Sequence, residues 1–173
     1  LLLSDGRPGH YHLSDGIVAA LARRRPVTLQ RLTIRRRRLV PSRAMAHLLN
    51  RAAPPSLTTA RAILALGYGL RPADLPAADL IVSAGGDTLA ANISAARLLA
   101  IPNIFYGSLR AYRSSDFALV LTSNAAEAGL PQPVLTLKPS ALDPDTLPPA
   151  PTALDPTATI AVLIGGDAAD VVF

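Results

Sequence analysis

Residues 4–16, with the sequence SDGRPGHYHLSDG, bring together side chains that bind anions and side chains that move protons. The glycines let the backbone approach a ligand closely, and Arg7 can donate two parallel hydrogen bonds to a phosphate or a carboxylate. A helix that follows such a loop adds unpaired N–H groups and the positive end of its dipole. We therefore predict that residues 4–10 bind an anion; alternatively, the glycines only shape a turn. The expected contacts are Gly6, Arg7 and Gly9.

Asp5 and His10 are the candidate bases of this loop. Both side-chain types deprotonate a hydroxyl when they lie within hydrogen-bond reach of it, and we predict that they are the catalytic residues. A structural role in the turn is the alternative for His10, and for His12 we favour capping or a solvated turn. No metal site is predicted, because histidines at i and i+2 lack a nearby third ligand and His47 lies on a separate predicted helix.

A second glycine turn, Gly85-Gly86-Asp87-Thr88, follows an apolar stretch and opens a predicted helix. Its glycines are candidate ligand contacts through the backbone. Asp87 has the position and the side chain of a helix N-cap, and we favour that role over catalysis. The expected ligand contacts are Gly85, Gly86 and Thr88.

A third polar loop lies within FYGSLRAYRSS, residues 105–115, and follows another apolar stretch. Ser108 and Arg110 are its expected ligand contacts; an ordinary polar loop is the alternative. The known nucleotide motifs are absent, because the first loop has the spacing Gly6-x-x-Gly9 rather than G-x-G-x-x-G and no G-K-[ST] sequence occurs.

The elements between these loops predict how they are positioned. Short apolar stretches alternate with stretches of helical period, which is typical of an α/β protein with a parallel sheet and helices on both faces. We predict a Rossmann-like three-layer domain, in which ligands bind beyond the carboxyl ends of the strands. The expected strands are residues 1–3, 27–34, 79–87, 102–107, 117–122 and 132–137; the expected helices are residues 11–25, two within 42–66 that are broken at 54–56, and one from 89. The alternation of residues 27–34 slips, which indicates a bulge or an edge strand.

The composition restricts the chemistry and the compartment. The chain has 173 residues, half of them hydrophobic, and no cysteine, which excludes disulfides, thiolate catalysis and most structural zinc sites. No apolar run approaches the ~20 residues that span a bilayer, and we expect no signal peptide. We expect a cytoplasmic protein, with a peripheral position on a membrane as the alternative.

The net charge of +5 favours an anionic partner. The run Arg35–Arg38 supplies clustered cations of the kind that contact nucleic-acid phosphates. No aromatic side chains are interleaved with this run and no nucleic-acid module is present, so we favour a solvated loop and predict no specific nucleic-acid binding.

The last residues of the chain repeat a sequence pattern found near its middle. LIVSAGGDTLA at residues 80–90 and IAVLIGGDAAD at residues 160–170 each join an apolar strand to Gly-Gly-Asp, and Gly165 and Gly166 are further expected ligand contacts. The expected organisation is an N-terminal domain over 1–142, a proline-rich linker over 143–157, and over 158–173 the first strand and turn of a truncated second α/β domain. A lone strand is expected to extend the sheet edge or to pair with another molecule as an edge-strand dimer.

Four stretches carry a family resemblance: LSDGRPGHYHLSDGIVAAL, LIVSAGGDTLAANISAARLL, VLTLKPSALDP and AVLIGG. In this order and spacing, the chain resembles the plant elongated-mitochondria fission factors and their bacterial relatives over nearly its whole length. The resemblance implies the B fold of glycosyltransferases, in which the donor lies mostly on the C-terminal Rossmann-like domain and the acceptor mostly on the N-terminal one. Bacterial relatives are described as predicted nucleoside-diphosphate-sugar epimerases, and plant members recruit a dynamin-like protein to the mitochondrial surface.

Two functions are consistent with these observations. The first is a glycosyltransferase-like protein that transfers or epimerises a nucleotide sugar, of which this chain is the acceptor-side half and is inactive alone. It needs no cofactor, since the nucleotide sugar is the substrate. The alternative is a non-catalytic scaffold that binds a partner protein or an acidic membrane surface. Binding of uridine diphosphate sugars, as against binding of acidic liposomes, separates the two.

Overall fold

Six parallel strands form one sheet in the computed structural model of the chain, which describes residues 1–51, 56–127 and 133–147. The strands are β1 (Leu2–Ser4), β2 (Arg31–Thr33), β3 (Ile81–Ala84), β4 (Asn103–Tyr106), β5 (Leu119–Thr122) and β6 (Pro133–Leu135). Their order across the sheet is β2-β1-β3-β4-β5-β6, and every neighbouring pair is parallel. The predicted parallel sheet is confirmed, and β2 is the edge strand that its irregular alternation indicated.

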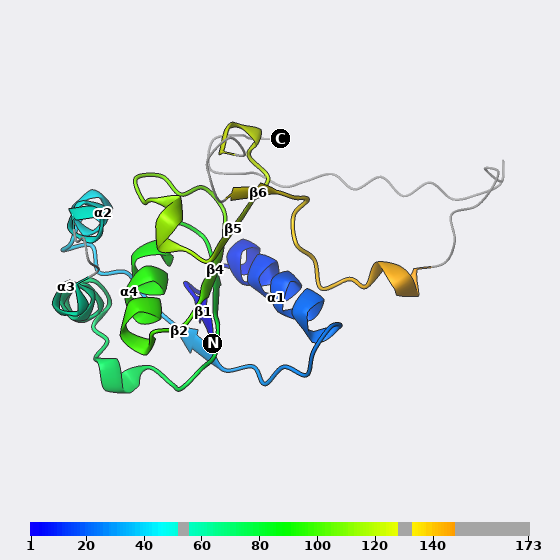
Figure 1. The fold of residues 1–173 in the computed structure, drawn as a ribbon, viewed down its shortest axis with the longest axis horizontal. Helices are drawn as coiled ribbons and strands as arrows, with labels where there is room; N and C mark the ends of the chain where they lie inside the picture. Colours follow the sequence, from blue (N-terminus) through cyan, green and yellow to red (C-terminus); the bar gives the residue numbers. More distant parts are fainter. Residues whose placement is uncertain (52–55, 128–132, 148–173) are drawn as a thin grey trace. The chain divides into compact units, whose positions relative to one another are not determined.

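Helices cover both faces of this sheet (Figure 1). On one face lies α1 (Pro8–Ala22). On the other lie α2 (Ser42–Arg51), α3 (Leu57–Ala62) with its π-helical continuation η1 (Ile63–Tyr68), and α4 (Leu89–Leu99). Short 3-10 turns occur at η2 (Pro72–Asp74), η3 (Ser114–Asp116), η4 (Ala125–Glu127) and η5 (Pro144–Thr146). This is the Rossmann-like α/β arrangement that the sequence predicted.

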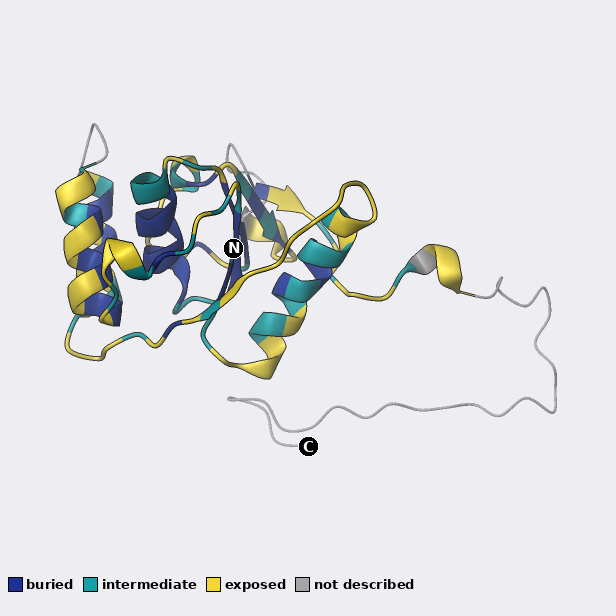
Figure 2. Cartoon of the chain, turned by 90° about the horizontal axis from the view of Figure 1, so that it is seen from below, coloured by how far each residue is buried: buried dark blue, intermediate teal, exposed yellow. Residues whose placement is uncertain are grey.

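Alternate strand residues face opposite layers, so the sheet joins two hydrophobic clusters. Ile81 and Phe105 pack in the larger cluster, with side chains from α2, η1 and α4. Val82 and Ile104 pack in the smaller cluster, with Ile17 of α1. Figure 2 shows the outcome: the central strands and the inward helix faces are buried, whereas the outward helix faces and the edge strands β2 and β6 are largely exposed.

Most elements depart from their predicted bounds by a few residues, and two of these departures have a clear physical reason. α1 begins at Pro8 rather than Tyr11, because proline suits the first turn of a helix, where its missing N–H has no partner to lose. The predicted loop therefore ends at Arg7, and His10 is helical. β2 is shorter than the predicted 27–34, since β1, its neighbour in the sheet, offers three paired residues.

After β6 the chain passes over α1. Gly16 of this helix lies against the backbone of Pro139 and Ser140, where a Cβ would stand 2.5 Å from the Pro139 carbonyl carbon. Arg23, one residue past the end of α1, pairs with Asp143 at 4.0 Å. One compact unit thus spans Leu1–Asp143.

The second half of the predicted organisation stays a prediction. The linker over 143–157 is described as far as residue 147, where η5 forms one turn. The strand and turn predicted over 158–173, with Gly165 and Gly166, lie outside the described residues. Among the residues that are described, no helix combines the length and the apolarity needed to cross a membrane.

Candidate functional site

Side chains from four connections meet beyond the carboxyl ends of β1, β2, β3 and β4. Arg7 follows β1, Arg36 follows β2, Asp87 follows β3 and Arg110 follows β4. The chain leaves β1 toward β2 on one side and later returns to β3 on the other. Such a switch point opens the crevice in which α/β sheets bind ligands. We call Arg7, Arg36 and Arg110 the arginine cradle.

Asp87 is the carboxylate around which the arginine cradle is arranged. Its Oδ2 accepts a hydrogen bond from Arg7 Nη2 at 3.1 Å, and its Oδ1 accepts one from Arg36 Nε at 2.8 Å. Burial alone raises the pKa of Asp87, but the bond from Arg36 and the charges of the cradle outweigh burial and lower it. The same bond raises the pKa of Arg36. Asp87 is therefore ionised at neutral pH.

The predicted N-cap role of Asp87 is wrong. α4 begins at Leu89, so Thr88 is the residue that directly precedes it. The carboxylate of Asp87 turns to the cradle instead, because bonds between ionised partners are stronger than a bond to a neutral amide. Thr88 was an expected ligand contact, yet its side chain is fully buried, with the hydroxyl 3.0 Å from Ser83 Oγ. The Thr88 hydroxyl also donates to the Gly85 carbonyl at 2.9 Å, so Thr88 stabilises the Gly-Gly turn rather than facing a ligand.

Two side chains approach the Gly85–Gly86 pair closely, and Gly85 is the position that favours glycine by its backbone conformation. Gly85 has φ +90°, and the His10 ring lies so near that a Cβ would overlap it. The guanidinium of Arg110 lies against Gly86 in the same way. The glycine pair thus lets groups from the first and third predicted loops close onto the second, and the structure brings all three loops together.

Asp5 and His10 form a hydrogen-bonded pair beside the cradle. Asp5 Oδ2 lies 2.7 Å from His10 Nδ1, and the Asp5 side chain is 5% exposed, whereas that of His10 is 29% exposed. A carboxylate that accepts from Nδ1 leaves Nε2 as the basic nitrogen of the neutral ring. The two residues expected to be catalytic are thus adjacent, in an arrangement that can take a proton from a hydroxyl.

The start of α1 offers fewer open amides than the sequence led us to expect. The N–H of Arg7 donates to Asp5 Oδ1 at 3.2 Å, and the N–H of His10 donates to the Arg7 carbonyl at 2.9 Å. Gly6, with φ +78°, turns the chain out of β1, and a Cβ on Gly9 would touch nothing. Because local bonds already use the N–H groups of Arg7 and His10, the Arg7 side chain is the main group that this segment offers to an anion.

Arg110 also borders a hollow of about 460 Å³. The other lining residues are Ser42, Arg43, Ala111 and Tyr112. The backbone of Arg110 is in the left-handed region, with φ +54°, which is uncommon for a residue other than glycine. The Tyr112 hydroxyl donates to the Ser42 carbonyl at 3.3 Å, and burial raises the pKa of Tyr112. Ser108 is exposed at the start of the same loop. The loop thus brings the Arg110 guanidinium and the hollow beside it to the site.

Sequence reasoning missed Arg36 and Tyr68. Arg36 belongs to the run Arg35–Arg38, whose other members are exposed as predicted, but Arg36 is half-buried and turns to Asp87. Its position just beyond a strand's carboxyl end was the available signal. Tyr68 ends η1, its hydroxyl donates to the Asp87 carbonyl at 2.8 Å, and burial raises its pKa. No local pattern marked Tyr68 for that role.

A buried polar network holds the Gly-Gly turn from below. Asn92 of α4 is fully buried; its Nδ2 donates to Ser83 Oγ at 2.8 Å and to the Ile104 carbonyl at 3.1 Å. Asn103 Nδ2 donates in turn to Asn92 Oδ1 at 2.6 Å. These bonds join β3, α4 and β4, so the turn that carries Asp87 has a rigid base.

The remaining histidines stand apart from this site. His12 is exposed on α1 and His47 is exposed on α2. Within residues 1–51, 56–127 and 133–147, no three histidine or acidic side chains gather in the way that metal ligands do.

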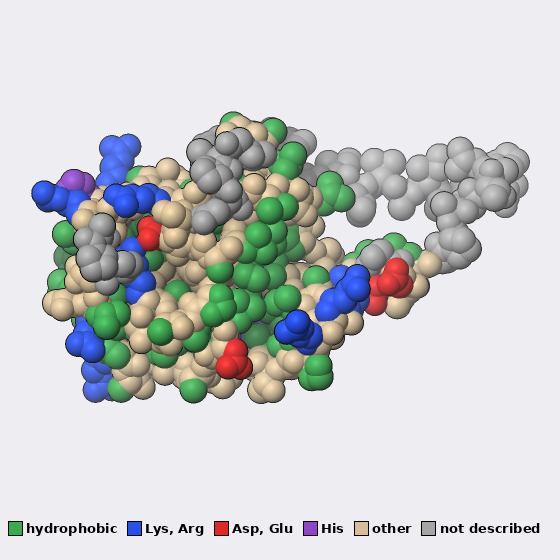
Figure 3. Space-filling view, in the orientation of Figure 1, with side chains coloured by type: hydrophobic (Ala, Val, Ile, Leu, Met, Phe, Trp, Pro, Cys, Tyr) green, Lys and Arg blue, Asp and Glu red, His purple; other side chains and the backbone are tan. Residues whose placement is uncertain are grey.

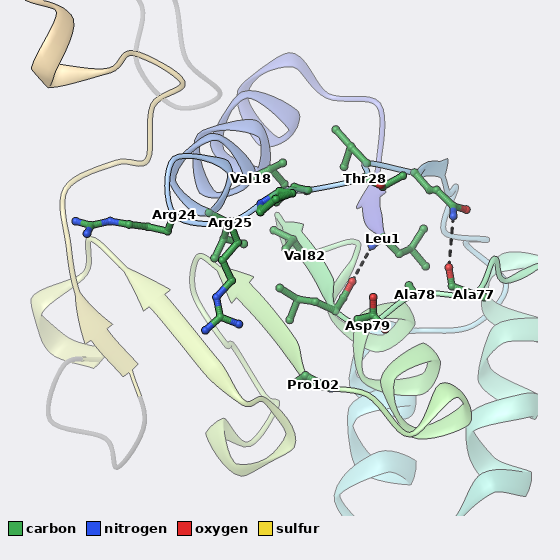
Figure 4. A pocket seen from close by; sticks show the side chains of 16 residues that line it. Leu1, Val18, Arg24, Arg25, Thr28, Ala77, Ala78, Asp79, Val82 and Pro102 are labelled. Atoms are coloured by element: carbon green, nitrogen blue, oxygen red, sulfur yellow. Dashed lines mark hydrogen bonds between the residues drawn. The ribbon is translucent and has the colours of Figure 1, made fainter.

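A larger pocket, of about 710 Å³, lies at the opposite edge of the sheet (Figure 4). Its walls include Leu1, Leu80 and Pro102, which stand just before β1, β3 and β4, and Arg24, which points away from the other lining side chains. None of the described residues that we expected to bind ligand lines it. Ligands of parallel α/β sheets bind at the carboxyl ends of the strands, so the candidate site is the one at the arginine cradle.

Comparison of the chain with protein-family models, with curated proteins and with solved structures finds no match. The family resemblance of the sequence therefore stays a prediction, and the function has to be inferred from the geometry of the site.

Proposed function

We propose that the arginine cradle binds the phosphate group of a small molecule, and that the chain is the acceptor-side half of a glycosyltransferase-like or epimerase-like protein acting on a nucleotide sugar. The observation that carries the proposal is the convergence of three arginines, from three connections, on one glycine turn at the switch point of the sheet. The planar fork of an arginine matches the oxygens of a phosphate. A solvated arginine loop has no reason to bring three such forks to one turn.

The charge of the site favours an anion even with Asp87 in place. Three guanidinium groups stand against two carboxylates, because Asp87 faces the cradle and Asp5 Oδ2 lies 3.9 Å from Arg7 Nε. Arg36 is 26% exposed and held in one place, whereas Arg7 is 65% exposed and can turn onto a ligand. Near a protein surface, two unit charges 4 Å apart attract by roughly 4 kcal/mol before screening by salt. Removal of one arginine should therefore be measurable in binding.

The Asp5–His10 pair supplies the proton transfer of the proposed reaction. Nε2 of His10 takes the proton of an acceptor hydroxyl, and the acceptor oxygen forms a bond to the anomeric carbon of the sugar. The bond from that carbon to the diphosphate oxygen breaks, and the nucleoside diphosphate leaves with the electron pair, its charge balanced by arginine. The family resemblance supports the acceptor-side assignment, under which residues 1–173 alone turn over no nucleotide sugar.

Calorimetric titration with inorganic phosphate, UDP and UDP-glucose tests the proposal. Arg7→Ala and Arg110→Ala should each weaken binding by about 1–3 kcal/mol, or roughly 5- to 150-fold. Arg71→Ala is the matched control, because Arg71 pairs with Asp74 outside the site and its loss should leave affinity unchanged. Absence of binding by all three compounds, or unchanged affinity in both cradle variants, overturns the proposal.

A scaffold that binds an acidic membrane surface is the second candidate, and the outer side of α2 and α3 favours it. Arginine side chains gather on this side of the molecule (Figure 3). Arg43 and Arg51 are exposed on α2, beside Leu48 at 49% exposure, and Leu57 of α3 is 48% exposed. Cationic and apolar side chains on one helix face suit anionic lipid headgroups. Cosedimentation with anionic but not neutral vesicles, reduced in Leu48→Ser, supports this candidate; equal recovery with both vesicle types excludes it.

A further inference from the structure

The Asp87 carboxylate occupies the place in the arginine cradle that an anionic ligand group needs. Both of its oxygens are bonded, each to a different arginine: Oδ1 to Arg36 Nε at 2.8 Å and Oδ2 to Arg7 Nη2 at 3.1 Å. A phosphate that bridges these two arginines needs the same two donors. The groups that would recognise the ligand are therefore already in use.

We propose that Asp87 is an internal competitor of the ligand: its carboxylate marks an oxyanion subsite between Arg7 and Arg36, and a phosphate group binds there by displacing it. This inference rests on the proposed function and adds the position of the subsite and the residue that limits its affinity.

The structure allows the carboxylate to leave while the turn stays in place. The main chain at Asp87 is held from both sides: the Tyr68 hydroxyl donates to the Asp87 carbonyl at 2.8 Å, and the Thr88 N–H donates to the Gly85 carbonyl at 3.0 Å. The Asp87 side chain is 22% exposed, so a rotation about its Cα–Cβ bond is enough to turn the carboxylate toward solvent. The subsite is thereby vacated without any movement of the backbone.

Displacement also selects the chemistry of the ligand. A free monocarboxylate offers the same charge and the same two oxygens as Asp87 but lacks its covalent attachment, so it gains nothing by the exchange. A phosphate monoester or a terminal diphosphate carries a second charge and a third oxygen. Arg110, which lies against Gly86 next to Asp87, is the further donor for that oxygen. The subsite should therefore accept phosphate and refuse carboxylates while Asp87 is present.

Titration of the wild-type chain and of Asp87→Asn with inorganic phosphate and with acetate tests this inference. The asparagine keeps the size of the side chain and removes its charge. Asp87→Asn should bind phosphate roughly 10- to 100-fold more tightly, because a charge-assisted bond no longer competes, and should bind acetate, which the wild type does not. Asp74→Asn, which removes a carboxylate from the exposed pair with Arg71, is the matched control and should change neither affinity. Adding Arg36→Ala to Asp87→Asn should abolish the gain.

Circular dichroism and thermal melting establish that each variant is folded, and Asp87→Ser serves in place of Asp87→Asn if the latter is not. Phosphate binding by the wild type that is equal or tighter than that of the folded variant overturns the competitor role and leaves the proposed function standing. Failure of both proteins to bind phosphate or UDP overturns the proposed function itself. Tighter phosphate binding by the folded variant than by the wild type supports the inference.

Discussion

Replacing Gly85 by alanine tests whether the close approach of His10 to the Gly-Gly turn shapes the site. The backbone at Gly85 has φ +90°, and a Cβ there would overlap the His10 ring. The alanine thus meets two separate penalties, one in its own backbone and one in the displaced imidazole, which also gives up its 2.7 Å hydrogen bond to Asp5.

The expected cost follows from adding these two penalties. A side-chain-bearing residue in a sparsely populated positive-φ conformation costs about 1–3 kcal/mol. The lost hydrogen bond contributes about 1 kcal/mol more. We therefore expect Gly85→Ala to lower the free energy of unfolding by about 2–4 kcal/mol, and to weaken any acid–base activity that depends on the position of His10.

Gly9→Ala is the matched control with the opposite sign. Gly9 lies in the first turn of α1, and a Cβ there would touch nothing, so alanine should stabilise the protein by about 0.4–1 kcal/mol. Urea denaturation of both variants, followed by circular dichroism, gives the two free energies. If Gly85→Ala is as stable as the wild type, or if Gly9→Ala loses as much as Gly85→Ala, the close-approach reasoning is refuted.

Three further predictions concern stability and binding. Asn92→Ala should lower the free energy of unfolding by about 2–4 kcal/mol, because it removes three buried hydrogen bonds, and urea denaturation should show a far smaller loss for the exposed Asn124→Ala. The lowered pKa of Asp87 means that its contribution to stability is complete above about pH 4 and is lost as the pH falls through the folded value, so thermal melts between about pH 5 and pH 2 should fall less steeply in Asp87→Asn. The run Arg35–Arg38 should give only nucleic-acid affinity that ignores sequence and falls steeply with salt, as measured by fluorescence anisotropy; tight, sequence-selective binding at physiological salt would contradict this.

The meeting of the three loops was predictable from the sequence because it depends on strand direction alone. Each loop follows an apolar stretch with the length of a strand, and parallel strands end at the same edge of a sheet. The pairing of Asp5 with His10 was also within reach, since both flank the start of one helix. Local pattern and strand direction were enough for both.

The residues that pair with Asp87 could not be predicted from the sequence, for a physical reason. Its local pattern is that of a helix cap, whereas Arg36 and Arg7 lie 51 and 80 residues away in the chain. Which of two roles a carboxylate takes depends on the cations that the fold brings to it, and an ionised partner outweighs a neutral amide. The close approaches at Gly85 and Gly86 have the same origin, because His10 comes from α1 and Arg110 from the loop after β4.

The contact of Gly16 with Pro139 has a consequence for the order in which the unit assembles. One partner stands in the first helix and the other lies beyond the last strand, so the contact closes a loop that contains almost the whole unit. Loops of this length close late, after the local contacts within them have formed. During synthesis, α1 therefore leaves the ribosome long before the segment that lies on it, and its Gly16 side stays open to water and to other chains until the sheet is complete.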